Sequence, residues 1–465
     1  MNTKRRTGRA RAILSFAAVF FLAANVSEAR YSGGTGESND PYRIATPNDL
    51  NDIGNHPEDF NDCFILVNDI NMAGFTYTTA LIAPDINNNI DDFQGTKFTG
   101  IFDGNDHKIT VLTIDDAGIG NDYLGLFGCN SGEINNLGLE QCYVSGQLNI
   151  GGMVGYNSGD VSKCYSIGTV AGTYVFVGGL VGQHERGSLS NCHSNVSVTG
   201  YRIVGGLVGM NRHNGSISDS YSNGCVLGTA QNVGDIGGLV GSSRGSISNC
   251  YSTASVNSDG DYLGGLVGRV GYYYDEEHYG DFGSVSRCYS TGDVNGGENV
   301  GGLVGFNCYG SVTDCYCTGD VNGRQDVGGL VGDNGHVGLG SLSRCYSTGD
   351  VNGANEVGGL VGDNDANYVS DCFWDIDKQT HGITESFGYT EGTVTNVEGL
   401  STGEMQIEST FTDAGWDFIE IWDIGENQTY PFLRVYPAGD LGHDGIVNFM
   451  DVAILADHWL EGTGP

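Results

Sequence analysis

Short apolar runs separated by Gly, Ser, Asn and Asp recur along most of this chain. Three such runs follow one another in a fixed order. V-G-G-L-V-G comes first, S-x-S-x-C-Y-S second and T-G-D-V-N-G third, the last being unchanged at 291–296, 318–323 and 348–353. Runs of four to seven residues bounded by turn formers are typical of β-strands. No unit contains a stretch with helical apolar spacing, so the pattern predicts three strands and three turns per unit.

The pentapeptide G-G-L/M-V-G marks each unit and begins at residues 151, 178, 205, 237, 264, 301, 328 and 358. The basic interval is 27 residues, and the longer intervals of 30, 32 and 37 residues are insertions into that period. A constant period with insertions in turns is typical of a solenoid. We therefore expect an all-β fold, a parallel β-helix whose coils lie about 4.8 Å apart. The right-handed form is preferred because left-handed β-helices have shorter, more uniform coils.

One spacing within the unit predicts a corner of the coil. Ile247 and Cys250 are three residues apart, so strict alternation cannot direct both side chains inward. A bend at Ser248-Asn249 would do so, and Asn, Asp, Arg or Lys stands at this second position in the other units. The pattern therefore predicts that the Cys lies inside the coil and the following Tyr outside.

Seven of the 13 cysteines occupy this inner position in successive units: Cys164, Cys192, Cys250, Cys288, Cys315, Cys345 and Cys372. A buried Cys behaves as a small apolar residue, which predicts a stacked ladder of thiols. Disulfides between neighbouring coils are the alternative, but in-register parallel side chains rarely meet the required dihedral angle. No C-x-x-C pair occurs, so no cysteine metal site is expected.

Aromatic residues follow these cysteines and are expected to form an outer row: Tyr165, His193, Tyr221, Tyr251, Tyr289, Tyr316, Tyr346 and Phe373. Such a row is either a platform for sugar rings or a stack that stabilises the sheet, and the structural interpretation is favoured. The longest insertion, Arg269–Gly283, contains an acidic and aromatic segment. It is the best local candidate for ligand contact, since loops on a rigid scaffold often carry function.

The two ends of the repeat region are expected to be capped, because a solenoid end exposes sheet edges. Residues 30–123 are assigned to an N-terminal cap and first coils, with Thr46 as N-cap and Pro47 as first residue of a short helix. Residues 124–397 form the repeat solenoid. Residues 398–437, rich in aromatic side chains, form a C-terminal cap.

Residues 1–29 have the pattern of a secretory signal peptide: a basic start, an apolar run over 12–26 and small residues before a cleavage point at Ala29. This run is too short for a membrane span, and no second one of spanning length follows. Without residues 1–29 the chain keeps 15 basic against 56 acidic residues. We expect an extracellular or cell-surface protein whose charge disfavours nucleic acid and anionic membranes as partners.

The last segment, residues 438–465, has the spacing of a calcium-binding loop. Oxygen ligands are expected from the side chains of Asp440, Asp444, Asn448 and Asp451 and from the carbonyl of Ile446. Gly445 supplies the sharp turn, and helical apolar spacing follows the loop. Gly442 stands where another oxygen ligand is usual, so water would complete the shell. Calcium is therefore the expected cofactor.

The repeated G-G-L-V-G and N-C-Y-S units resemble GLUG-motif repeats, found in bacterial surface proteins and beside some immunoglobulin-A-cleaving metalloproteases. The resemblance covers roughly 124–374 and implies an extracellular repeat scaffold; the zinc motif of those proteases is absent. Residues 438–465 resemble one half of a type I dockerin. Dockerins bind cohesin modules through two calcium-loaded halves, and this chain has one.

Two functions remain open at this stage. The first is a non-catalytic surface, adhesion or carbohydrate-associated scaffold, docked through the C-terminal segment to a polysaccharide, a cell-surface protein or a cohesin-like module. The second is a polysaccharide lyase or hydrolase, since parallel β-helices include both. Such enzymes need clustered carboxylates. Here the acids recur at turn positions, as at Asp293, Asp320 and Asp350, and His107 stands alone, so the scaffold is preferred.

Overall fold

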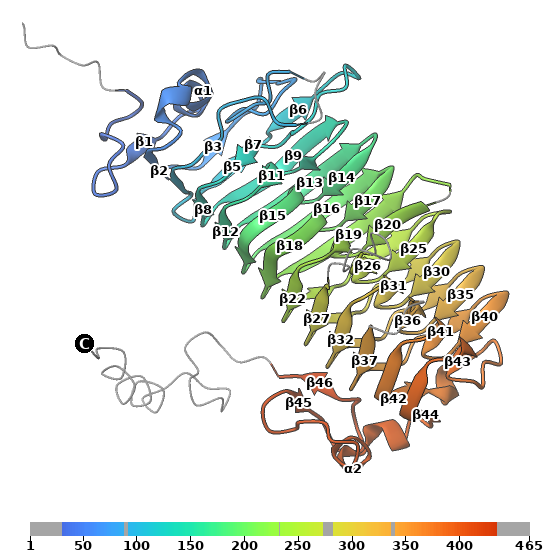
Figure 1. The fold of residues 1–465 in the computed structure, drawn as a ribbon. Helices are drawn as coiled ribbons and strands as arrows, with labels where there is room; N and C mark the ends of the chain where they lie inside the picture. Colours follow the sequence, from blue (N-terminus) through green and yellow to red (C-terminus); the bar gives the residue numbers. More distant parts are fainter. Residues whose placement is uncertain (1–29, 88–91, 232, 273–281, 336–339, 435–465) are drawn as a thin grey trace, which may run out of the picture.

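The computed structural model describes residues 30–87, 92–231, 233–272, 282–335 and 340–434. These residues form a long stack of coils in which the chain advances along one axis from the N-terminal to the C-terminal end (Figure 1). All strand pairs between coils are parallel, so the predicted parallel β-solenoid is confirmed. The predicted signal peptide and the predicted calcium loop at Asp440–Asp451 lie outside the described residues. No helix in the described part of the chain is long and apolar enough to cross a membrane.

Each coil from β20 (Val233–Gly237) to β39 (Val351–Asn352) runs through five short strands. One set is β25 (Asp261–Gly264), β26 (Val267–Val270), β27 (Ser284–Ser286), β28 (Tyr289–Ser290) and β29 (Val294–Asn295). They pair in register with the next coil: β30 (Glu298–Gly301), β31 (Val304–Asn307), β32 (Ser311–Thr313), β33 (Tyr316–Cys317) and β34 (Val321–Asn322). Three strands per unit were predicted. Three strands are present in the coils of β14 (Val175–Gly178) to β16 (His193–Gly200) and of β17 (Arg202–Gly205) to β19 (Tyr221–Gly228), whereas the coils from β20 to β39 have five because the chain also bends before S-x-S-x-C-Y-S and before V-N.

The equivalent strands of the other coils continue these series. In line with β25 lie β10 (Ile150–Gly151), β14 (Val175–Gly178), β17 (Arg202–Gly205), β20 (Val233–Gly237), β35 (Gln325–Gly328) and β40 (Asn355–Gly358). In line with β26 lie β7 (Phe127–Asn130), β11 (Val154–Asn157), β15 (Val181–Ser190), β18 (Val208–Ser218), β21 (Val240–Ser243), β36 (Val331–Asp333), β41 (Val361–Asn364) and β43 (Phe387–Thr390). The remaining coil strands are β8 (Glu133–Asn135), β9 (Gly138–Gly146), β12 (Asp160–Ser162), β13 (Tyr165–Gly172), β16 (His193–Gly200), β19 (Tyr221–Gly228), β22 (Ser246–Ser248), β23 (Tyr251–Ser252), β24 (Ser255–Asn257), β37 (Ser341–Ser343), β38 (Tyr346–Ser347), β39 (Val351–Asn352), β42 (Tyr368–Asp375) and β44 (Thr393–Leu400).

Close approach of the backbone explains the paired glycines of the motif. A Cβ on Gly264 would lie 2.0 Å from the carbonyl oxygen of Val267, and one on Gly265 would lie 2.1 Å from that of Gly302 in the next coil. No side chain fits at such distances, so only glycine allows the bend between β25 and β26. The bend turns one apolar run into two strands that meet at an angle.

The predicted corner is present in every repeat. Asn249, Arg287 and Asp314 all have left-handed backbone angles, with φ values of 53°, 51° and 54°. Each turn directs the following Cys into the core, where Cys250 is 1% exposed and Cys288 is fully buried. The seven cysteines of this row are free thiols, which agrees with the thiol ladder rather than the disulfide alternative. Burial in this core raises the pKa of the Cys250 thiol well above its ordinary value.

A second ladder, of buried asparagine side chains, runs inside the coils at the ends of β31, β36 and β41. The Nδ2 of Asn307 donates to Asn334 Oδ1 at 2.8 Å, and the Nδ2 of Asn334 donates to Asn364 Oδ1 at 2.8 Å. Near the other end of the solenoid Asn130 donates to Asn157 in the same way, at 2.7 Å. These side chains are fully buried, so each amide satisfies its neighbour in the next coil.

Both ends of the coil stack are covered. The N-terminal end consists of β1 (Tyr42–Ile44), helix α1 (Pro47–Asn55), a short 3₁₀ helix (Pro57–Asp59), β2 (Cys63–Leu66), β3 (Ile70–Asn71), β4 (Ile101–Asp103), β5 (Lys108–Thr110) and β6 (Thr113–Asp115). Thr46 accepts a hydrogen bond from the Asp49 N–H as N-cap, and Pro47 opens α1, as predicted. One 3₁₀ helix (Ile376–Lys378) lies between β42 and β43. Beyond the last coil strand, β44, lie a second 3₁₀ helix (Glu404–Gln406), α2 (Glu408–Thr412), β45 (Trp422–Asp423) and β46 (Phe432–Leu433).

Candidate functional site: the outer ladder face

The segment Y-S-T-G-D-V-N places alternate side chains on the outside of each coil. Ser290 and Val294 are buried, whereas Asp293 and Asn295 are exposed and Tyr289 is half-buried. Since successive coils pair in register, each outward residue becomes a row along the solenoid. We call these rows the outer ladder face, which comprises Tyr289, Thr291, Asp293 and Asn295 and the equivalent residues of the neighbouring coils.

The aromatic row of this face is a continuous stack. Ring centroids of successive residues lie 4.8 to 5.0 Å apart from Tyr165 to Tyr346, and neighbouring rings are inclined by only 3° to 8°. Each ring face is therefore covered by the next ring, and solvent meets ring edges and hydroxyl groups. A sugar ring stacks on an open aromatic face, so this geometry supports the structural interpretation of the row.

The C-terminal cap covers one end of the aromatic row. Tyr346 and Phe373 are buried in a cluster with Met405, Phe411, Trp416 and Trp422. The Tyr346 hydroxyl donates to the carbonyl oxygen of Pro431 at 2.6 Å. Towards the N-terminal end the row is half-buried, and burial together with Glu140 raises the pKa of Tyr165 to about 12. Burial lowers the pKa of His193, so the open part of the row is uncharged at neutral pH.

The acids of T-G-D-V-N-G serve the turns, as predicted. The carboxylate of Asp293 accepts the backbone N–H of Asp320 at 3.1 Å, and that of Asp320 accepts the N–H of Asp350 at 3.0 Å. Each acid therefore ties one coil to the next through its own side chain. The second oxygen of each carboxylate and its charge remain on the outer face.

A row of asparagine amides lies beside the acids. Asn295 Nδ2 donates to Asn257 Oδ1 at 3.1 Å, and Asn352 Nδ2 donates to Asn322 Oδ1 at 3.2 Å. Sequence analysis did not single out this row. It could have been predicted from T-G-D-V-N-G, in which Asn follows Asp by two residues. Alternate residues of a strand share a face, so the Asn should lie on the same outer face as the Asp.

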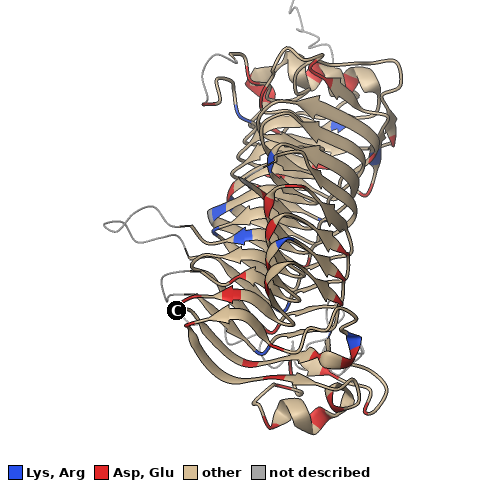
Figure 2. Ribbon diagram, turned by 90° about the vertical axis from the view of Figure 1, so that its right-hand side faces the viewer, with Lys and Arg blue, Asp and Glu red and all other residues tan. Residues whose placement is uncertain are grey.

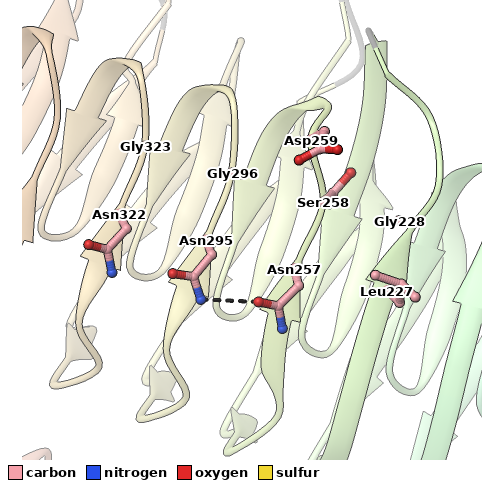
Figure 3. Close-up of a pocket in the computed structure, with 9 residues that line it drawn as sticks. All are labelled: Leu227, Gly228, Asn257, Ser258, Asp259, Asn295, Gly296, Asn322 and Gly323. Carbon is pink, nitrogen blue, oxygen red and sulfur yellow. Dashed lines mark hydrogen bonds between the residues drawn. The ribbon is translucent and has the colours of Figure 1, made fainter.

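The amides of Asn257, Asn295 and Asn322 line a shallow groove of about 370 Å³ (Figure 3). The groove runs across successive coils, where β24, β29 and β34 lead into the next bend, and its lining is Leu227, Gly228, Asn257, Ser258, Asp259, Asn295, Gly296, Asn322 and Gly323. In the close-up the three asparagine side chains stand in line, one per coil. The lining thus offers amide donors and acceptors, one carboxylate and one apolar side chain.

Other residues that the sequence singled out lie away from this groove. Acidic residues are distributed along the solenoid, and basic ones are few (Figure 2). At the base of the long insertion the Arg269 guanidinium lies 3.0 Å from Asp235 Oδ1 and 4.5 Å above the Tyr262 ring. His107 Nδ1 lies 3.0 Å from Asp69 Oδ1 at the surface. The tip of the insertion, residues 273–281, is not among the described residues.

Comparison with known proteins identifies the repeats. The GLUG motif matches residues 177–199, 232–257, 259–295 and 296–322. The chain is 32% identical over 153 residues to Halomucin of Haloquadratum walsbyi, which covers 32% of this chain and 2% of that relative. It is 43% identical over 68 residues to a Gly-rich membrane protein of Evansella cellulosilytica, covering 12% of this chain and 8% of that relative. The chain thus spans a small part of the length of both relatives.

Among solved structures, the chain is similar to an immunoglobulin A1 protease from Bacteroides ovatus. The TM-score is 0.43 at 19% identity, with 87% of this chain and 95% of that chain covered. The match to the GLUG motif confirms the resemblance of the repeats over the matched residues. The dockerin-like reading of residues 438–465 stays a prediction.

Proposed function

We propose that this protein is a non-catalytic surface scaffold that binds a neutral polysaccharide along the groove of the outer ladder face. One observation carries the proposal: Asn257, Asn295 and Asn322 line the groove at the same place in successive coils. A polymer that repeats its hydroxyl groups meets the same amide at each coil. Many weak, identical contacts then add up along the chain.

The chemistry of the groove suits hydroxyl groups. An amide donates and accepts hydrogen bonds, as hydroxyl groups do, and pairs of this kind need no charge. The chain has 57 acidic and 20 basic residues, so its field repels anionic polymers. A neutral polysaccharide is therefore the preferred ligand class.

The surface location rests on separate support. The relatives carry the names of a mucin and a membrane protein, which agrees with export through residues 1–29. Docking through residues 438–465 is part of the proposal: calcium held by Asp440, Asp444, Ile446, Asn448 and Asp451 would order this segment for a cohesin-like module or a cell-surface protein.

Binding of neutral and anionic polysaccharides by the full chain tests the proposed ligand class. We expect gel retardation or heat of binding with one or more neutral polymers and none with polyanions of the same length. The triple variant Asn257→Ala/Asn295→Ala/Asn322→Ala should weaken binding at least tenfold. Ser311→Ala, an exposed change on the outward side of β32, should leave it unchanged.

Two results would contradict the proposal. Equal binding by the triple variant and the parent chain, with both folded by circular dichroism, would remove the groove as the site. Release of shortened saccharides by the parent chain would favour the alternative of a polysaccharide lyase or hydrolase.

A further inference from the structure

A second pair of rows faces across the bend of V-G-G-L-V-G and shares no residue with the lining of the groove. One row consists of the residue before this motif, which has a left-handed backbone in Asn299, Asp326 and Glu356, with φ values of 50° to 52°. The other row is the residue after the second V-G, such as Phe306 and Asp333. We call the two rows, together with the bend between them, the inner elbow.

Nearer the N-terminus the inner elbow contains stacked aromatic rings and an ion pair of opposite charges. The ring of Tyr262 stacks on that of Phe306, with centroids 5.2 Å apart. Arg269 lies over Tyr262 and forms an ion pair with Asp235 in which both side chains are largely buried. Here the elbow holds one acid and one base, so its charge is balanced.

Two coils further on, acidic residues occupy both rows. Asp326 and Glu356 lie opposite each other, between the registered pairs Gln325–Asn355 and Val327–Val357. Asp363 comes from the other side of the bend, and one carboxylate oxygen from each of the three acids lies within 4.8 Å of the other two. Asp333 is in register with Asp363 and adds a fourth carboxylate to the elbow.

Two buried oxygen atoms at this place accept no hydrogen bond. Asp326 is 8% exposed, and its Oδ1 is fully covered and without a partner among the described residues. In the preceding coil Asn299 is 9% exposed, and its Oδ1 is likewise covered and without a partner among the described residues. Buried polar atoms almost always have a partner, because leaving one unsatisfied costs free energy. Both oxygens are therefore available as ligands.

The surrounding charges act on Asp326 in one direction. Burial and the adjacent Glu356 carboxylate raise its pKa to about 8, and Asp333 and Asp363 act in the same sense. The charges that act most strongly on Asp326 are all carboxylates.

We propose that Asp326, Glu356 and Asp363 bind a divalent cation, with Ca²⁺ the preferred ion. All three ligands are carboxylates, and hard cations prefer such oxygen donors to nitrogen or sulfur. Ca²⁺ accepts six to eight oxygens in flexible geometry, so three carboxylates, the Asn299 amide oxygen and water form a suitable shell. The ion would join the coils that contain β35 and β40. This proposal is independent of polysaccharide binding and of the predicted loop at Asp440–Asp451.

Calcium titration of the full chain tests this site, with Asp440→Asn/Asp444→Asn as background to remove the predicted C-terminal loop. In this background we expect Ca²⁺ to bind and to raise the melting temperature. Adding Asp326→Asn/Glu356→Gln should weaken binding at least tenfold and abolish the rise. Adding Glu133→Gln/Glu398→Gln instead, which removes two exposed acids, should change neither.

Terbium gives a second measurement that keeps all the ligands. Tyr389 is in register with Asp363, so its ring lies one coil from the site and should sensitise bound Tb³⁺ luminescence. Tyr389→Phe should reduce this emission several-fold while Ca²⁺ still competes for the ion. The proposal is overturned if Asp326→Asn/Glu356→Gln binds Ca²⁺ as tightly as its background, or if Tyr389→Phe leaves the emission unchanged.

Discussion

His184 replaces an asparagine in the buried amide ladder. It is in register with Asn157 and Asn211 in the adjacent coils, and its Nδ1 lies 2.9 Å from Asn157 Nδ2. The side chain is fully buried, and its Nε2 has no partner among the described residues. Burial lowers the pKa of His184 to about 4, because a charged ring would lose its hydration.

This residue predicts loss of stability in acid. The unfolded chain binds a proton at His184 near the ordinary pKa of 6.5, whereas the folded chain does so only near 4. Stability is therefore unaffected above pH 6.5 and declines as the pH falls from 6.5 towards 4. The total linked to His184 is roughly 3 kcal/mol. Urea unfolding at a series of pH values measures it.

The variant His184→Asn isolates this contribution, since Asn is the residue that the ladder uses in neighbouring coils. We expect it to match or exceed the parent in stability at pH 5 and to show a shallower decline below pH 6.5. A decline as steep as that of the parent would assign the acid sensitivity to another group.

At the scale of the strand, a side-chain row is a consequence of register. Tyr251 stacks on Tyr221 at 4.8 Å and on Tyr289 at 4.9 Å. Tyr251→Ala removes both contacts, and each aromatic pair contributes about 0.5–1.5 kcal/mol beyond area burial. We therefore expect a loss of about 1–3 kcal/mol in the free energy of unfolding, measured by chemical denaturation.

Two further variants serve as controls for this loss of stability. Tyr251→Phe retains the ring and should stay close to the parent. Tyr174→Ala removes a ring that is 48% exposed and should cost less than about 0.5 kcal/mol. Equal losses for Tyr251→Ala and Tyr174→Ala would show that the stack adds nothing to stability.

The same scale explains what the sequence could predict. The corner at Asn249, the inward Cys row and the outward Tyr row follow from a three-residue spacing that repeats in every unit. The acidic site was missed because V-G-G-L-V-G reads as one strand. In the structure it bends between β35 and β36, and likewise between β40 and β41, which brings Asp326 and Asp363 to one elbow. The bend angle depends on backbone contacts between coils, which no single unit reveals.

For the whole molecule, stability is that of a one-dimensional stack. Each coil pairs with the coil before it and the coil after it, so the ends are the weakest places. The sequence predicted caps because solenoid ends expose sheet edges, with a helix start at Thr46-Pro47 at one end and aromatic residues over 398–437 at the other. It could not predict that the aromatic residues of the C-terminal cap pack on the side chains of Tyr346 and Phe373, because that contact joins segments far apart in the chain.

This arrangement predicts that damage to the cap spreads from one end. Trp422 is fully buried, and its ring lies 4.7 Å from that of Trp416. Trp422→Ala leaves a cavity and should lower the free energy of unfolding by about 3–5 kcal/mol. In a one-dimensional stack that cost falls first on the nearest coils, so hydrogen exchange should accelerate in β37, β38 and β42 and remain unchanged in β11 and β15.

The control lies in the same cap: Ile419→Ala alters a side chain that is 80% exposed and should leave all exchange rates unchanged. Uniform acceleration along the whole solenoid in Trp422→Ala would mean that the coils unfold as one unit. End-to-end cooperativity would then transmit the state of the cap to the outer ladder face, and a ligand bound in the groove would in turn protect the cap. If hydrogen exchange instead accelerates only near the cap, the coils unfold independently. The groove then keeps its shape while the cap opens.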